Sequence, residues 1–230
     1  MPAQTIVGGV PAPGSFGTVG VPMVCDPSFN AARMSIKPDE YEGAGTIGGH
    51  YRVGASSGAL TGVAAGGLVY SFRAPTTPSL WFVVKRVTVH AVITTAFTTA
   101  QALDYDIIKV SSWTGGDTGG TAVTMSAGGK LRVNMANSQI AQIMIATTAA
   151  NAAGTPKTLD ANAMAEAVIS QTNAIGSGGQ VDIYKHDAFG EHPIILGSNE
   201  GFNIRVVTAM GAVGVVKLYV STTWVEAPGY

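Results

Sequence analysis

Alternating apolar and polar side chains over residues 80–113 form the strongest pattern in the chain. The segment LWFVVKRVTVHAVITT is rich in β-branched and aromatic residues and has no helical period. After a threonine-rich connection, ALDYDIIKVSSW alternates in the same way and places Asp104 and Asp106 on one face. Because successive side chains of a strand point to opposite faces, the pattern predicts two long strands at the centre of a β-sandwich or barrel. Strict alternation puts Trp81, Val83 and Val87 on one face of the first strand.

Shorter strand patterns flank this pair. Those before it are HYRVG and LVYSFR, and those after it are TAVTM and KLRVNM, with Gly128–Gly129 as a hairpin turn, followed by QIAQIMIA. The C-terminal third adds QVDIYKH, HPIIL, FNIRVVTA and VVKLYVSTTWVE. Strands spaced by turns, without a sustained amphipathic helix, indicate a sandwich or barrel. With about eight antiparallel strands, we expect an all-β, jelly-roll-like antiparallel β-sandwich over residues 49–230.

Residues 147–180 carry the weakest pattern. Asp160 is a suitable N-cap for a short helix over residues 161–170, in which Ala163, Met164, Ala167 and Val168 form an apolar stripe. The alternative is a long loop with one strand. The alanine content does not separate the two interpretations, and we favour the loop.

Residues 1–48 are expected to form an extended arm. Prolines and glycines punctuate this region, which disfavours a helix or a central strand. Apolar residues nevertheless recur through it, whereas disordered tails are usually poor in them. We therefore predict that the arm lies on its own domain or on a neighbouring subunit, rather than forming a floppy leader. The candidate interface residues are Ile6, Val7, Phe16, Val21, Phe29, Met34 and Ile36.

Charge is scarce in this chain. Charged residues make up 12%, about half the usual share of roughly 25%, whereas hydrophobic residues make up 46%. Because charge is depleted at interface cores, this favours a subunit covered by neighbours over an ordinary Ala/Gly-rich secreted protein. A net charge of −1 provides no field to attract nucleic acid or an anionic membrane. We therefore expect neither as a partner.

Features of location and redox state point to the cytosol during assembly. The single cysteine, Cys25, has no partner for an internal disulfide. The start MPAQTIVGGVPAPGSF lacks the basic and apolar regions of a signal peptide. No window approaches the length of an uninterrupted apolar membrane span. We expect a protein that is made and assembled in the cytosol.

No motif for catalysis or cofactor binding stands out. Asp117-Thr118-Gly119 matches the aspartic-protease triplet, but it occurs once and in turn-like surroundings, whereas that chemistry needs two aspartates. The four histidines, His50, His90, His186 and His192, give one short cluster over residues 186–192, with Asp187 and Glu191. Its spacing does not match a known zinc site, so we expect no metal and no cofactor. Asp104 and Asp106 are expected to be solvated or to pair with Arg86 and Lys85. The interpretation is of a protein that is not an enzyme.

Three segments carry a resemblance to a known class of proteins. These are HYRVGASSGALTGVAAGGLVYSFR, VVKRVTVHAVITTAFTTAQALDYDIIKVSSWTGGDTGGTAV, and PIILGSNEGFNIRVVTAMG with the final VVKLYVSTTWVE. Together they resemble tailed-bacteriophage virion structural proteins over residues 48–226, without the arm. Gly116 stands where the pattern often has serine. The motifs mark the fold rather than an activity.

The resemblance implies a jelly-roll capsid decoration (cement) protein on the exterior of the virion. Its implied partners are the major capsid protein and further copies of itself, as a homo-oligomer with a trimer favoured. A fibre- or tail-associated module that binds a host receptor or glycan is the alternative. Such modules usually expose aromatic side chains, whereas the predicted faces place Trp81, Trp113 and Trp224 mostly in the core. We expect the arm to clasp an adjacent subunit or the capsid protein by adding strands to an open sheet edge.

Overall fold

The computed structural model describes residues 25–26, 31–32, 48–125, 129–131, 133, 135–148, 156–186 and 193–227. The chain divides into two compact units, residues 1–41 and 42–230. In the first unit, β1 (Cys25–Asp26) pairs with β2 (Ala31–Ala32) in an antiparallel register. All seven candidate interface residues of the arm, from Ile6 to Ile36, lie outside the described residues.

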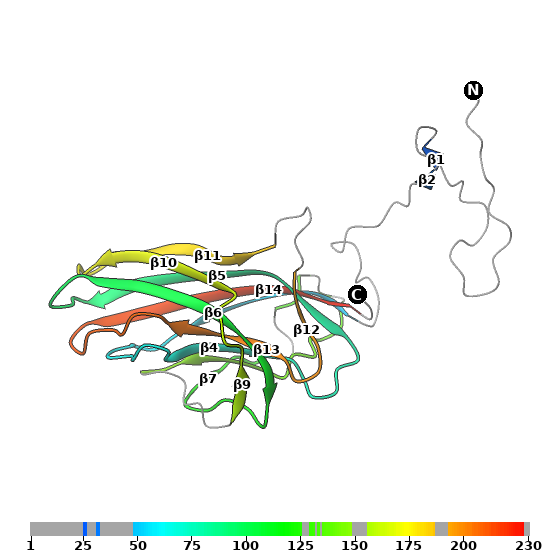
Figure 1. Cartoon of the computed structure of the whole chain (residues 1–230), viewed down its shortest axis with the longest axis horizontal. Coiled ribbons are helices and arrows are strands. Elements are labelled where there is room, and N and C mark those ends of the chain that lie inside the picture. The colour runs from blue at the N-terminus through cyan, green and yellow to red at the C-terminus, as the bar shows by residue number, and fades with distance from the viewer. Residues whose placement is uncertain are drawn as a thin grey trace. The chain divides into compact units, whose positions relative to one another are not determined.

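The second unit consists of two antiparallel sheets (Figure 1). The seven-stranded sheet contains β4 (Leu68–Arg73), β6 (Gln101–Trp113), β7 (Gly120–Ala122), β8 (Gln142–Ala146), β9 (Lys157–Leu159), β10 (Ala165–Thr172) and β13 (Gly201–Val206). The five-stranded sheet contains β3 (Gly49–Ser56), β5 (Trp81–Thr95), β11 (Gly178–Lys185), β12 (Ile194–Leu196) and β14 (Val215–Ala227). The described residues include no helix.

The strand order is that of a jelly roll. Four antiparallel pairs are nested inside one another: β6 with β10, β5 with β11, β4 with β13, and β3 with β14. Successive nested pairs belong alternately to the two sheets. The five-stranded sheet therefore contains the order β11-β5-β14-β3, and the seven-stranded sheet contains β10-β6-β13-β4, extended by β8 and β7. Two sheets wound in this way enclose one core and limit exposed edges. The predicted jelly-roll-like antiparallel sandwich is confirmed.

The two long predicted strands are present, one at the centre of each sheet. β5 pairs with β14 and β11, whereas β6 pairs with β13 and β10. They therefore face each other across the core instead of sharing hydrogen bonds. Aromatic side chains join the sheets: the ring of Trp224 on β14 lies 5.1 Å from that of Phe72 on β4, edge to face. A hydrogen bond of 2.9 Å between Tyr70 and Thr222 makes a second buried contact across the core.

A β-bulge changes which residues of β5 face the core. Along β14, Thr223 pairs with Arg86 but Trp224 pairs with Val84, so Lys85 is an extra residue in the ladder. A bulge reverses the alternation on either side of it. Phe82 and Val84 point inward before the bulge, and Val87 follows after it. The prediction that Trp81 shares the face of Val87 is therefore wrong.

Trp81 is 46% exposed, so its expected place in the core is also wrong, whereas Trp113 and Trp224 are buried as expected. The reason is local. Trp81 precedes the bulge and lies on the opposite face from Phe82, whose side chain is in the core.

The uncertain region 147–180 forms strands where it is described. The helix over residues 161–170 is wrong, because β10 occupies Ala165–Thr172 and pairs with β6. A loop with one strand is closer, although a second short strand, β9, precedes β10 and also pairs with β6. Tertiary pairing has overridden the helical preference of alanine. The QIAQIMIA strand is confirmed as β8, which starts at Gln142.

The prediction of a strand over KLRVNM is wrong for those residues of the segment that the structure describes. Lys130, Leu131, Val133 and Met135 lie outside every strand, and Lys130 makes only an isolated bridge to Tyr51. The preceding short strand, β7, pairs instead with β8.

Candidate functional site

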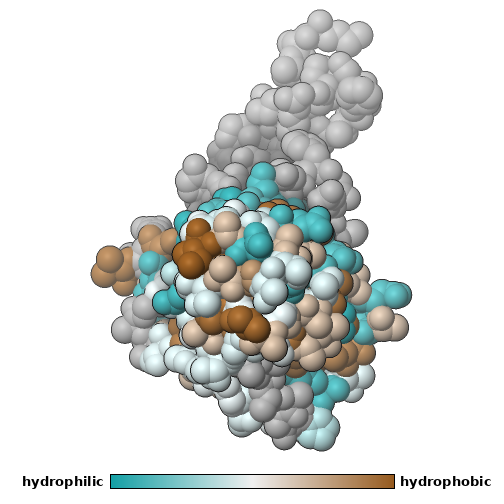
Figure 2. Space-filling view, turned by 90° about the vertical axis from the view of Figure 1, so that its left-hand side faces the viewer, coloured by the Kyte–Doolittle hydropathy of each residue, from teal (hydrophilic) through white to brown (hydrophobic). Residues whose placement is uncertain are grey.

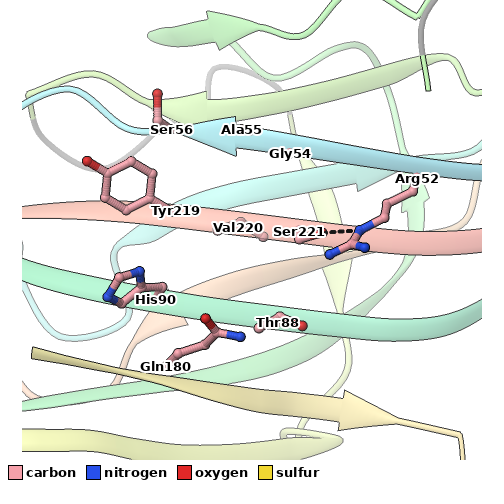
Figure 3. Close-up of a pocket in the computed structure, with 10 residues that line it drawn as sticks. All are labelled: Arg52, Gly54, Ala55, Ser56, Thr88, His90, Gln180, Tyr219, Val220 and Ser221. Carbon is pink, nitrogen blue, oxygen red and sulfur yellow. Dashed lines mark hydrogen bonds between the residues drawn. The ribbon is translucent and has the colours of Figure 1, made fainter.

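An open groove of about 490 Å³ crosses the outer face of the five-stranded sheet (Figure 3). Tyr51 and Val53 of β3 point into the core, so the alternate residues between and after them point outward. The same alternation on β5, β11 and β14 brings outward-facing side chains of four strands together. The main lining residues are Arg52, Gly54, Ser56, Thr88, His90, Gln180, Tyr219 and Ser221.

Aromatic rings form one end of the groove. Tyr219 is paired in register with His90 on β5 and with Ser56 on β3. The ring centroids of Tyr219 and His90 lie 5.7 Å apart, and the Lys217 ammonium lies 5.6 Å from the Tyr219 ring. Tyr219 is 42% exposed, so part of its aromatic ring is accessible to a ligand or a partner.

Polar contacts hold the rest of the groove in place. The Arg52 Nε donates a hydrogen bond of 3.1 Å to Ser221 Oγ (Figure 3). At the border, Arg86 donates two bonds to Asp182, at 2.8 and 2.7 Å, and Thr88 adds a third of 2.7 Å. The Arg86 guanidinium thereby lowers the pKa of the Asp182 carboxyl below its ordinary value. Charge at the border is thus balanced, and Arg52 is the one guanidinium or ammonium in the lining.

The groove is open at Gly54. No atom lies within 4 Å of the position that a Cβ at Gly54 would occupy. Sequence reasoning missed this site, because it depends on the register of four strands that are distant in sequence. Gly54 lies in a strand that the pattern predicted. The sequence of one strand, however, does not show which side chains of the neighbouring strands lie beside it.

A smaller hollow of about 350 Å³ surrounds Trp81. It is lined by residues 77–81 together with Gly197 and Ser198. A Cβ on Gly197 would approach the Trp81 ring to 2.9 Å, so the indole lies close against the backbone there. This is a second place where an aromatic side chain is open to the surface.

Asp117, from the protease-like triplet, is in a buried ion pair. Lys157 Nζ lies 2.6 and 2.8 Å from its two carboxylate oxygens and 3.3 Å from Asn203 Oδ1. The Lys157 and Asp117 side chains are 4% and 0% exposed. No motif joins these three residues, so sequence reasoning did not bring them together.

Asp104 and Asp106 share a face of β6, as predicted, but their expected partners are wrong. Asp106 accepts two hydrogen bonds from Arg205, and Asp104 accepts two from Thr208. Bonding to Asp106 raises the pKa of Arg205. Strand β13 lies beside β6 in the sheet, whereas Arg86 is on the opposite sheet and pairs with Asp182.

The described histidines are spread over the sandwich. His50 lies in β3, His90 in β5, and His186 directly after β11, whereas residues 187–192 lie outside the described part of the chain. Within the described residues, no three His, Cys, Asp or Glu side chains gather as a metal site would require. Of the cluster expected over residues 186–192, the structure therefore describes only His186.

Comparison with known proteins gives no relative for this chain. No protein-family model, curated protein or solved structure matches it. Among the described residues, no helix has the length and apolar character needed to cross a membrane.

Proposed function

We propose that the protein is a virion structural subunit of the capsid decoration type, which binds the head of a tailed phage. The open groove across the five-stranded sheet is the observation that carries this proposal. Its lining is broad, shallow and almost uncharged, and depletion of charge is the compositional mark of interface cores. The partners proposed are the major capsid protein and further copies of this chain.

Composition supports the same proposal. Only 12% of all residues are charged, about half the share of roughly 25% that is usual in soluble domains. Figure 2 shows large pale areas of residues with intermediate hydropathy, in which strongly apolar and strongly polar positions are scattered. The jelly-roll frame and the resemblance over residues 48–226 supply the phage context of the proposal.

Binding to particles tests this function. Purified protein is added to heads of the phage that encodes it, after removal of the native copies, and bound copies per head are counted by quantitative mass spectrometry. We expect high, saturable occupancy, reduced at least about tenfold by Gly54→Glu, because a carboxylate in the groove must be desolvated at the interface. Thr121→Glu on exposed β7 is the matched control and should bind like the wild type. Equal binding by both variants would exclude the groove as the contact surface.

A fibre- or tail-associated role in glycan binding is the second candidate. The exposed ring of Tyr219, in the same groove as the polar side chains of Arg52 and Gln180, favours it, since sugar-binding sites combine an aromatic face with hydrogen-bonding side chains. A glycan array with the wild type and Tyr219→Ala separates the two functions. Binding that is lost in the variant, together with few copies per virion, would support the glycan-binding role.

A further inference from the structure

A lysine, an aspartate and an asparagine from three separate segments meet on the seven-stranded sheet. Lys157 begins β9, Asp117 lies in the loop between β6 and β7, and Asn203 is in the middle of β13. Asn203 lies between the core residues Phe202 and Ile204, so its side chain is on the outer face of the sheet. It is nevertheless fully buried, and the side chains of Asp117 and Lys157 are only 0% and 4% exposed.

The Asp117 carboxylate is held next to the lysine by its backbone. The Asp117 N–H donates to Gln142 Oε1 at 2.7 Å, and Gln142 Nε2 donates back to the Asp117 carbonyl at 2.9 Å. Burying an ammonium and a carboxylate carries a large desolvation cost. Lys157 Nζ and the Asp117 carboxylate are 2.6 Å apart, a distance over which a proton can pass directly between them. A lysine amine acts as a nucleophile only in its neutral form.

The Asn203 amide presents its carbonyl group to this amine. Its Nδ2 donates to the Tyr70 carbonyl oxygen at 3.3 Å. Because a carbonyl oxygen only accepts hydrogen bonds, this contact fixes the amide nitrogen towards Tyr70 and leaves Oδ1 towards Lys157, 3.3 Å from Nζ. The Lys157 nitrogen therefore lies next to the Asn203 amide, on the side of its carbonyl group. The hydroxyl of Ser71, the register neighbour of Asn203, is buried without a partner among the described residues and is an available donor.

We propose that Lys157 and Asn203 form an intramolecular isopeptide bond, with Asp117 as the proton carrier. Asp117 takes a proton from Nζ, and the neutral amine attacks Asn203 Cγ to form a tetrahedral intermediate. Asp117 then gives its proton to Nδ2, the Cγ–Nδ2 bond breaks, and the nitrogen leaves with the surplus Nζ proton as ammonium. The net reaction converts a lysine ammonium and a primary amide into a secondary amide and ammonium. It needs no oxidant, reductant or added cofactor.

The surroundings suit this single-turnover reaction. The Trp113 ring lies 5.7 Å from Nζ and covers it, and the burial of all three side chains keeps competing water away. The bond would join β9 to β13 across a sequence separation of 46 residues. It would attach a short peripheral strand covalently to the centre of its sheet. This inference rests on the buried cluster alone and does not depend on the proposed phage function.

Intact-mass spectrometry of the denatured full-length protein tests the bond. We expect a mass about 17 Da below that of the sequence, the loss of one ammonia. Tandem spectra should identify a branched peptide that links positions 157 and 203. Lys157→Arg keeps the positive charge but has no nucleophilic amine, and Asp117→Asn removes the proton carrier, so both should retain their full mass.

The matched control is Lys109→Arg, which makes the same change in the more exposed pair of Lys109 with Glu200, 3.4 Å apart. It should show the same loss of mass as the wild type. A wild-type protein at its full sequence mass, both fresh and after prolonged incubation, would overturn the proposal. So would a loss of about 18 Da mapped to Lys157 and Asp117, because condensation with a carboxyl group releases water instead. Neither result depends on whether a variant folds.

Discussion

Glu226 is a buried carboxylate near the end of β14, and its contacts fix the segment before β8. It accepts hydrogen bonds from Ser138 Oγ at 2.5 Å, from the Gln139 N–H at 3.0 Å and from Trp224 Nε1 at 3.0 Å. Burial nevertheless raises the pKa of Glu226 above its ordinary value of 4.5. Burial, with a contribution from the Glu226 charge, also raises the pKa of Tyr51 to about 12.

Replacing Glu226 by glutamine should change how stability depends on pH. The folded protein holds the Glu226 proton more tightly than the unfolded chain does, so ionisation favours unfolding. The wild type should therefore lose stability as the pH rises from 4.5 through the raised pKa. Glu226→Gln should lack this loss, because its amide does not titrate. Urea unfolding at a series of pH values measures the difference.

Asp182→Asn should change the pH dependence of stability in the opposite direction, measured in the same experiment. The pKa of Asp182 is lowered by Arg86, so its contribution to stability is present above the ordinary pKa and disappears as the pH falls through the lowered value. The effect should be small, because the pair is at the surface.

For Glu226, stability curves that run parallel in the wild type and in Glu226→Gln would contradict the assignment of the pH dependence to this residue.

At the scale of the strand, the period of two predicted where strands occur but not how they pair. The long strands β5 and β6 could be predicted from the sequence, since their β-branched composition agrees with their tertiary contacts. The bulge at Lys85 could not, because it is visible only in the register with which β5 pairs with β14. β10 was hidden for a related reason: an alanine-rich edge strand has no strong pattern of its own, and its pairing with β6 determines its structure.

Gly201 shows how closely the strands of the seven-stranded sheet pack. A Cβ at this position would lie 2.0 Å from the Phe72 carbonyl oxygen and 2.6 Å from the Trp113 ring. We expect Gly201→Ala to lower the free energy of unfolding by about 1–3 kcal/mol, the usual effect of overpacking. Gly54→Ala in β3, where the added methyl group meets nothing within 4 Å, should be neutral or slightly stabilising. Urea titrations of both variants check this, and similar midpoints would show that the backbone at Gly201 adjusts.

At the scale of the whole molecule, the sequence predicted the jelly roll but neither candidate site. Strand number and spacing, which are local properties, indicate a sandwich of about eight strands, and the nested pairing of those strands makes it a jelly roll. The groove needs outward residues of β3, β5, β11 and β14 in register, and the buried cluster joins positions 40 and 46 residues apart. Neither spacing carries a local signal, because the nested pairing of the strands creates both sites.

Removing residues 1–45 tests the arm and the sandwich separately. The ladders of both sheets and the core lie within residues 48–227, so the truncated protein should unfold cooperatively with a midpoint within about 2 °C of the full chain. If the arm clasps a neighbour, as we propose, occupancy on phage heads should fall while this midpoint stays the same. A lower midpoint would instead make the arm part of the fold. Unchanged occupancy would place head binding in the sandwich, where Gly54→Glu already tests the groove.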